Sequence, residues 1–77
     1  MLEVTLPKYG VTMQEATVLQ WLKEDGERVA PGEEIIELET DKAELVLDAS
    51  EGGTLHHRVA VGDVVGVGAV LAVVDDD

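Results

Sequence analysis

The chain is short, strongly acidic and free of cysteine: its 77 residues carry seventeen acidic and five basic side chains, a formal net charge of −12. This length accommodates one domain, and without cysteine neither a disulfide nor a thiolate metal site can form. Because nucleic acid and anionic membrane surfaces repel such a negative protein, we expect one small domain that binds neither of them.

The apolar residues predict an all-β domain. Thirteen valines lie in short apolar stretches separated by glycine and acidic residues, a pattern typical of β-sandwiches and barrels. Alternation of apolar and polar residues predicts strands over residues 3–6, 18–23, 34–39, 43–48, 53–59 and 70–75. A helix over residues 13–24 is the alternative for one segment, because Gln, Glu, Ala and Leu favour helices.

The second half of the chain repeats the first. A shift of about 36 residues aligns the following pairs: Glu15 with Glu51, Leu19 with Leu55, Gly26 with Gly62, Val29 with Val65, and Gly32 with Gly68. The repeat is lost where Leu6 falls on Lys42. We therefore expect two similar halves, related by an approximate two-fold axis, that each contribute strands to both of two facing sheets, with the glycines in turns.

The segment around Lys42 predicts an antiparallel hairpin. Placing the apolar residues on one face sets the pairs as Leu38 with Leu45, Ile36 with Leu47, and Thr40 with Ala43. Asp41 and Lys42 are then the two loop residues, although Asp-Lys is a poor dipeptide for a primed turn. The same register sets Glu39 opposite Glu44, an unfavourable like-charge pair. A tip so poorly suited to stability suggests that it presents something outward.

Lys42 is the single basic residue among eight acidic ones between residues 33 and 51. The simplest interpretation is a solvated lysine that neutralises its neighbours. The acidic residues favour its charged ammonium form, so Lys42 is a poor nucleophile or base by itself. An exposed lysine on a rigid hairpin is better suited to modification by a separate enzyme that removes its proton and supplies an activated acyl group.

The motif Glu39-Thr40-Asp41-Lys42-Ala43 resembles the signature of lipoyl domains from the acyltransferase component of 2-oxo acid dehydrogenase complexes. Residues 7–15 resemble the Pro-x-x-Gly-x-x-Met-x-Glu opening of that family, and Trp21, Gly26, Gly32 and residues 53–55 follow in the family's order. The resemblance implies a flattened barrel or sandwich of two four-stranded antiparallel sheets. It also implies that the modified lysine lies at a hairpin tip, at the opposite end from the termini.

The resemblance further implies a lipoyl group linked through an amide to Lys42. The resemblance implies that the residues flanking this lysine contribute to its recognition, namely Glu39, Thr40, Asp41, Ala43 and Glu44. A partner recognition loop would follow the first strand, comprising Lys8, Tyr9, Gly10, Val11, Thr12, Met13 and Glu15. The chemistry would belong to the cofactor, and the protein would act as a carrier with no catalytic residue or metal of its own.

Four partners are implied by the same resemblance. A lipoate ligase or lipoyl transferase attaches the group, and a thiamine-diphosphate-dependent 2-oxo acid decarboxylase loads it. An acyltransferase core passes the acyl group to coenzyme A, and dihydrolipoamide dehydrogenase reoxidises the dithiol. We expect residues 1–77 to form a single lipoyl domain, the N-terminal part of a longer acyltransferase chain, in a bacterial or archaeal cytoplasm or a mitochondrial matrix.

Other interpretations fit less well. A biotinyl carrier domain shares the implied fold but has methionine on both sides of its lysine, where this chain has Asp41 and Ala43. The lipoylated carrier of the glycine cleavage system is considerably longer. A metal site at His56, His57 and the terminal aspartates is disfavoured because the two histidines are neighbours on a strand and point to opposite faces. A structural adaptor without a cofactor is a further alternative.

Overall fold

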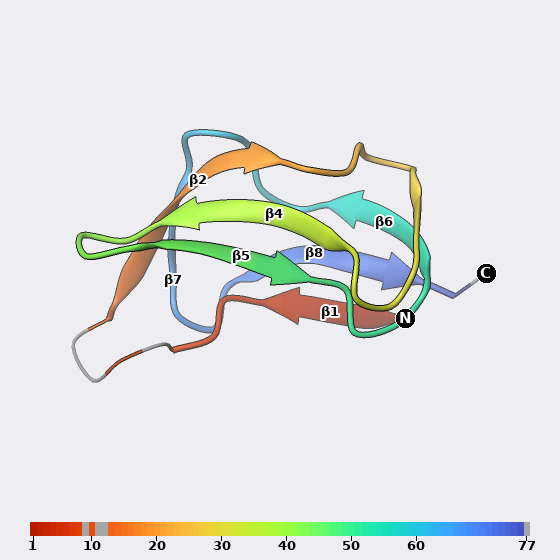
Figure 1. Ribbon diagram of the computed structural model, residues 1–77, viewed down its shortest axis with the longest axis horizontal. Coiled ribbons are helices and arrows are strands. Elements are labelled where there is room, and N and C mark those ends of the chain that lie inside the picture. Colours follow the sequence, from red (N-terminus) through yellow and green to blue (C-terminus); the bar gives the residue numbers. More distant parts are fainter. Residues whose placement is uncertain (9, 11–12, 77) are drawn as a thin grey trace.

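The computed structural model describes residues 1–8, 10 and 13–76, and within these the chain is all β (Figure 1). The eight strands are β1 (Leu2–Thr5), β2 (Glu15–Trp21), β3 (Arg28–Val29), β4 (Glu34–Glu39), β5 (Glu44–Asp48), β6 (Gly53–His57), β7 (Val64–Gly66) and β8 (Val70–Asp75). The helix considered for residues 13–24 is wrong, because β2 occupies most of that segment. No helix in the described part of the chain is long and apolar enough to cross a membrane.

The strands form two four-stranded antiparallel sheets, as predicted. One sheet has the order β5-β4-β2-β7 and is called here the lysine sheet; the other has the order β1-β8-β6-β3 and is called the terminal sheet. No strand of one sheet pairs with a strand of the other among the described residues, so the fold is a sandwich and not a closed barrel.

The core lies between the sheets and is made of branched aliphatic side chains. Ile35, Ile36, Leu38, Leu55 and Leu71 are fully buried, and no polar side chain of the described residues is buried. Two consecutive isoleucines can both face inward because the β4–β5 register shifts between Glu34 and Ile36. Packing of apolar surface therefore supplies the cohesion that disulfides supply in many domains of this size.

The predicted internal repeat is confirmed by the turns and the sheet orders. Strands β5, β4, β2 and β7 correspond in order to β1, β8, β6 and β3. Gly26 and Gly62 both have positive φ, 87° and 94°, which residues with a Cβ rarely adopt. The amide of the following residue closes a matching turn in each half, from Glu27 to Glu24 O at 3.0 Å and from Asp63 to Ala60 O at 3.0 Å.

Two details of the sequence alignment are wrong. The register of β2 against β4 shifts at Leu19, whereas β6 pairs with β8 without interruption. This extra residue makes buried Val18, not Leu19, the counterpart of buried Leu55. For the same reason the counterpart of Glu15 is Gly52 and not Glu51. A bulge inserts one extra residue into one strand, so a constant shift along the sequence misaligns the residues on one side of it.

The second correction concerns Leu6, which does not correspond to Lys42. The amide of Gly32 donates to Ala49 O at 2.7 Å, and the amide of Gly68 donates to Leu6 O at 2.9 Å. These matching bonds make Ala49 the counterpart of Leu6. The tip between β4 and β5 therefore corresponds to the place where the chain begins and ends, and it lies at the opposite end of the sandwich from both termini (Figure 1).

The aromatic rings of two repeat counterparts, Trp21 and His57, stack on each other. Their ring centroids lie 3.6 Å apart with an interplanar angle of 9°. The Trp21 indole N–H donates to Val59 O at 3.2 Å, and His57 Nε2 lies 2.9 Å from Lys23 O. Because counterparts meet only near the axis that relates them, this pair marks the two-fold axis and joins the two halves.

Candidate functional site

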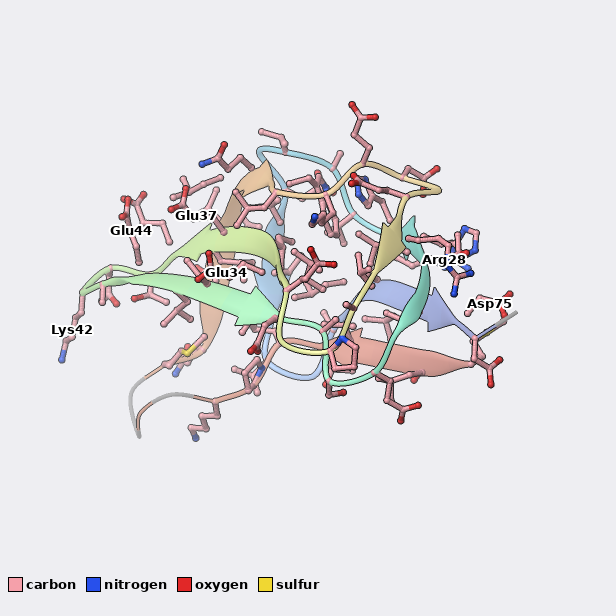
Figure 2. All side chains as sticks on the ribbon, turned by 45° about the vertical axis from the view of Figure 1, so that its right-hand side comes forward. Arg28, Glu34, Glu37, Lys42, Glu44 and Asp75 are labelled. Carbon is pink, nitrogen blue, oxygen red and sulfur yellow. The ribbon has the colours of Figure 1, made fainter. Side chains whose placement is uncertain are left out.

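The hairpin has the register that the sequence predicts. Leu38 pairs with Leu45, Ile36 with Leu47 and Glu39 with Glu44, and the backbone amide of Thr40 donates to Ala43 O at 2.8 Å. Asp41 and Lys42 form the tip, and both are exposed. Figure 2 shows the Lys42 side chain projecting away from the strands. Its ammonium forms no ion pair with any described residue.

Thr40 explains how this tip closes without glycine. Asp41 and Lys42 both have negative φ, so the loop is not a primed turn. The Thr40 hydroxyl instead accepts bonds from the amides of Lys42 at 3.3 Å and Ala43 at 3.1 Å, and it donates to Ala43 O at 2.9 Å. A local side-chain turn of this kind fixes the backbone around the lysine.

Carboxylates are concentrated on the outer face of the hairpin formed by β4 and β5. Glu39 lies opposite Glu44, and Glu34 lies opposite Asp48, so two like-charge pairs face each other across β4 and β5. Figure 2 shows Glu34, Glu37 and Glu44 on the hairpin that carries Lys42. Cross-strand pairs of like charge oppose folding. This face therefore has a charge distribution that folding alone does not favour.

The ion pairs around Lys23 lie at the far end of β2 from the tip. Lys23 Nζ is 2.9 Å from Glu33 and 3.8 Å from Glu27. The hydrogen bond to Glu33 raises the pKa of Lys23 above its ordinary range, and Lys23 in turn lowers the pKa of Glu33. Lys23 and Glu33 are half-buried and paired with each other, which suits a structural clasp between the end of β2 and the loop before β4.

An open groove of about 410 Å³ lies beside the tip. Its lining comes from the start of β2 and the end of the hairpin, namely Gln14, Glu15, Ala16, Thr17, Glu39, Thr40 and Asp41. Pairing of Thr17 with Glu39 brings these segments together. Sequence reasoning missed Ala16 and Thr17, because only the β2–β4 register reveals that they lie next to the hairpin. Gln14 falls within the predicted recognition loop but was not named among its residues.

The described part of the predicted recognition loop approaches the same end of the molecule. Glu15 lines the groove, whereas Lys8 and Gly10 are exposed. Met13 packs against the core, and its amide donates to Gly10 O at 3.2 Å. Tyr9, Val11 and Thr12 were also predicted to belong to this loop, and they lie outside the described residues.

The histidines do not form a metal site in this structure. His57 is held by its stack on Trp21 and by Lys23 O, and its amide bonds to Asp25 Oδ1 at 2.8 Å. Across residues 1–8, 10 and 13–76, no group of three or more His, Asp or Glu side chains is arranged to hold a metal ion. His57 therefore has a structural role at the axis.

Comparison with known proteins agrees with this geometry. Residues 2–74 match the family model described as "Biotin-requiring enzyme", which covers biotinyl and lipoyl attachment domains. The solution structure of the lipoyl domain of the 2-oxoglutarate dehydrogenase complex from Azotobacter vinelandii superposes with a TM-score of 0.81 and 27% identity, covering 99% of this chain and 98% of that one. A β-sandwich with an exposed lysine at a hairpin tip thus defines a cofactor-attachment domain, and the chain belongs to the biotinyl/lipoyl attachment family.

Curated relatives point to the lipoyl branch of that family. The acetyltransferase component of the acetoin cleaving system of Pseudomonas putida is 42% identical over 92% of this chain. The succinyltransferase component of the 2-oxoglutarate dehydrogenase complex of Bacillus subtilis is 38% identical over 99%. The chain spans about a fifth of the length of these relatives, 20% and 18%. The predicted resemblance to lipoyl domains, which carry lipoic acid covalently on a lysine, is confirmed.

Proposed function

We propose that the chain is the lipoyl carrier domain of a 2-oxo acid dehydrogenase complex and that Lys42 carries the cofactor. The observation that carries this proposal is the exposed Lys42, which forms no ion pair with the described residues, at the tip of a tightly closed hairpin in a chain similar to a solved lipoyl domain and to dihydrolipoyllysine acyltransferase components. The tip fits the group because the lysine is accessible and its backbone is fixed by Thr40.

Attachment forms an amide between Lys42 Nζ and the carboxyl carbon of an activated lipoyl donor, either an acyl adenylate or an acyl thioester. The Lys42 ammonium loses one proton to the attaching enzyme, and its nitrogen lone pair then bonds to the carboxyl carbon. The bond to the leaving group breaks with its electron pair, and the nitrogen releases a second proton. Lys42 loses its charge in this step, which leaves the acidic tip without its basic residue.

The residues of this chain then present the group and identify it to partner enzymes. When attached, the lipoyl group supplies a dithiolane that accepts an acyl group and two electrons. Thr40 holds the tip, and the paired strands β4 and β5 hold it away from the core. We further infer that the domain works within a longer acyltransferase chain, where tethering raises its concentration at each active site.

The partners follow from this role. They are a lipoate ligase or lipoyl transferase for attachment, a thiamine-diphosphate-dependent decarboxylase for loading, an acyltransferase core and dihydrolipoamide dehydrogenase. The loop of residues 8–15 is the proposed recognition element for the decarboxylase, which is supported by the position of Glu15 in the groove beside the tip. If changes at Tyr9, Val11 and Thr12 leave the loading rate of the lipoylated domain unaltered, this role for the loop is wrong.

Mass spectrometry tests the attachment site directly. The chain is incubated with a lipoate ligase, lipoate and ATP, and the modified peptide is identified. We expect the lipoyl mass on Lys42 alone and none on Lys42→Ala. Lys8 and Lys23 serve as internal controls, because both lie outside a hairpin tip. Label on either of them, label retained by Lys42→Ala, or modification by a biotin ligase in place of the lipoate ligase would contradict the proposal.

A further inference from the structure

The edge of the lysine sheet formed by β7 carries exposed apolar side chains. Val64 is 61% exposed and Val67 is 41% exposed, although valine is more often buried. Sheet geometry does not require valine at these positions: the counterpart of Val64 in the terminal sheet is Arg28, and the counterpart of Val67 is Pro31. The same backbone therefore accommodates a charged side chain where this edge exposes an apolar one.

This valine edge, defined as Val64 and Val67, borders the groove beside the tip. Val64 pairs with Thr17, and the amide of Val67 donates to Gln14 O at 3.1 Å. Thr17 and Gln14 both line the groove. The surface next to Lys42 thus combines two exposed valines on one side with the carboxylates of Glu15, Glu39 and Asp41 in the groove.

The size of this surface fits a transient partner better than a second copy of the chain. A stable interface buries about 800 Å² on each partner with an apolar centre. One partly exposed valine on a three-residue edge strand and a second just after that strand supply only a small fraction of that area. A like copy would also bring its own carboxylates against the groove, which opposes pairing of two acidic surfaces.

The enzyme that attaches the cofactor must come closest to this surface. Before attachment the reactive atom is Lys42 Nζ, which sits at the end of only four methylene groups. The active site of the attaching enzyme must therefore reach the tip itself and contact the surface beside it. Enzymes that act after attachment meet a reactive group at the end of a much longer arm, so they can contact this end of the domain, for example at residues 8–15, while their active sites lie farther from the tip.

We propose that the valine edge and the adjoining acidic groove form the docking surface for the lipoate-attaching enzyme, whose matching surface combines an apolar patch with basic side chains. This inference rests on the proposed function of Lys42. The apolar contact supplies affinity that salt does not screen. The carboxylates supply attraction that weakens as salt screens it.

Steady-state kinetics of a purified lipoate ligase, with the unmodified chain as the varied substrate, tests this proposal. For the double variant V64T/V67T we expect KM to rise about fivefold with kcat within about twofold of the original, because the contact contributes to binding and not to the chemical step. Threonine keeps the β-branched shape and the strand propensity. Far-UV circular dichroism and thermal melting verify that the variant is folded.

Val46→Thr is the matched control. Val46 is 41% exposed, like Val67, but it lies on β5 at the opposite edge of the same sheet. We expect this variant to keep the original KM. Raising the salt concentration should raise KM by the same factor for the original chain and for V64T/V67T, because the variant retains the groove carboxylates.

Each other outcome identifies what has failed. If the original chain is not lipoylated on Lys42, the proposed function fails, whatever the valines do. If Lys42 is lipoylated and V64T/V67T has an unchanged KM, or if Val46→Thr raises KM equally, the docking proposal alone is overturned. If KM is unchanged and sedimentation shows that the double variant has lost a dimer formed by the original chain, the valine edge binds a second copy of the chain. If KM is unchanged and only the reaction with the decarboxylase is slowed, the edge binds the decarboxylase.

Discussion

The two sheets of this molecule have the same strand order and the same turns, yet their outer faces differ. The lysine sheet places Glu34 and Glu37 at positions where the terminal sheet has Val70 and Val73. The glycine turns with positive φ occur in both halves. Features present in both sheets are those that the fold requires. Features present in one sheet alone, the acidic face and the tip lysine, are those that function can explain.

The two ends of the sandwich show the same contrast. At one end β4 and β5 are joined by a tip that the Thr40 hydroxyl closes. At the other end the counterparts β8 and β1 pair in the same register without a tip that joins one to the other. The pairing of the strands does not depend on a covalent connection between them. The connecting residues at the tip are therefore free to serve recognition.

The largest expected effect comes from moving the lysine within the tip. Exchanging Asp41 and Lys42 should abolish lipoylation. Moving the lysine by one residue in a tight hairpin points its side chain in a very different direction, and attachment requires near-attack geometry. Neither residue is buried, so the fold should be retained. A mass assay measures attachment, and circular dichroism checks folding. Full lipoylation of the folded exchange variant would show that the ligase recognises the charges around the lysine and not the position of the lysine in the hairpin.

A second prediction contrasts the counterparts Gly53 and Ala16. A Cβ on Gly53 would overlap the carbonyl oxygen of Asp75 and would lie 2.9 Å from Val74 Cγ1, so Gly53→Ala should destabilise the fold by about 2–3 kcal/mol. Ala16→Gly, at the matching place in the lysine sheet, should cost about 1 kcal/mol. Urea unfolding measures both. Equal losses would show that the two sheets pack more alike than the structure indicates.

A third prediction addresses closure of the tip. Thr40→Ala removes the hydroxyl that bonds to Lys42 and Ala43, so stability should fall by about 1 kcal/mol. Lipoylation should slow because the lysine is less firmly held. Thr40→Ser retains the hydroxyl and should behave like the original chain in both assays. If serine fails as alanine does, the methyl group and not the hydrogen bonds is what matters.

The smallest expected effect concerns the ion pair between Lys23 and Glu33. The counterparts of these two residues in the other half, Val59 and Ala69, pack against the core instead. Because folding lowers the pKa of Glu33, the stabilisation by Glu33 is present at neutral pH and is lost as the pH falls through that lowered pKa. Lys23→Met should therefore lower the melting temperature slightly at neutral pH and not at acidic pH. If the melting temperature of the variant is also lower at acidic pH, the loss comes from packing of the methylene groups of Lys23 and not from the ion pair.

Much of the fold and the centre of the site could be predicted from sequence, for a physical reason. Alternation with period two specifies which face of a strand is buried, and pairing Leu38 with Leu45 leaves one register for the hairpin. That register places Lys42 at the tip. The glycines at equivalent positions specify turns because only they adopt positive φ readily. Each of these constraints involves residues that are close together in the sequence, so it can be recognised without knowledge of the tertiary structure.

The bulge at Leu19, the stack of Trp21 on His57 and the groove beside the tip were decided only by the tertiary structure. A bulge depends on which partner strand lies alongside, and the stack depends on where the two-fold axis passes. The groove exists because Thr17 pairs with Glu39, which brings segments from distant parts of the chain together. The sequence by itself determined which residues face inward in the regular parts of the strands and where the lysine turns outward. Long-range pairing determined which side chains surround that lysine, because those neighbours are set by the packing of the whole sandwich.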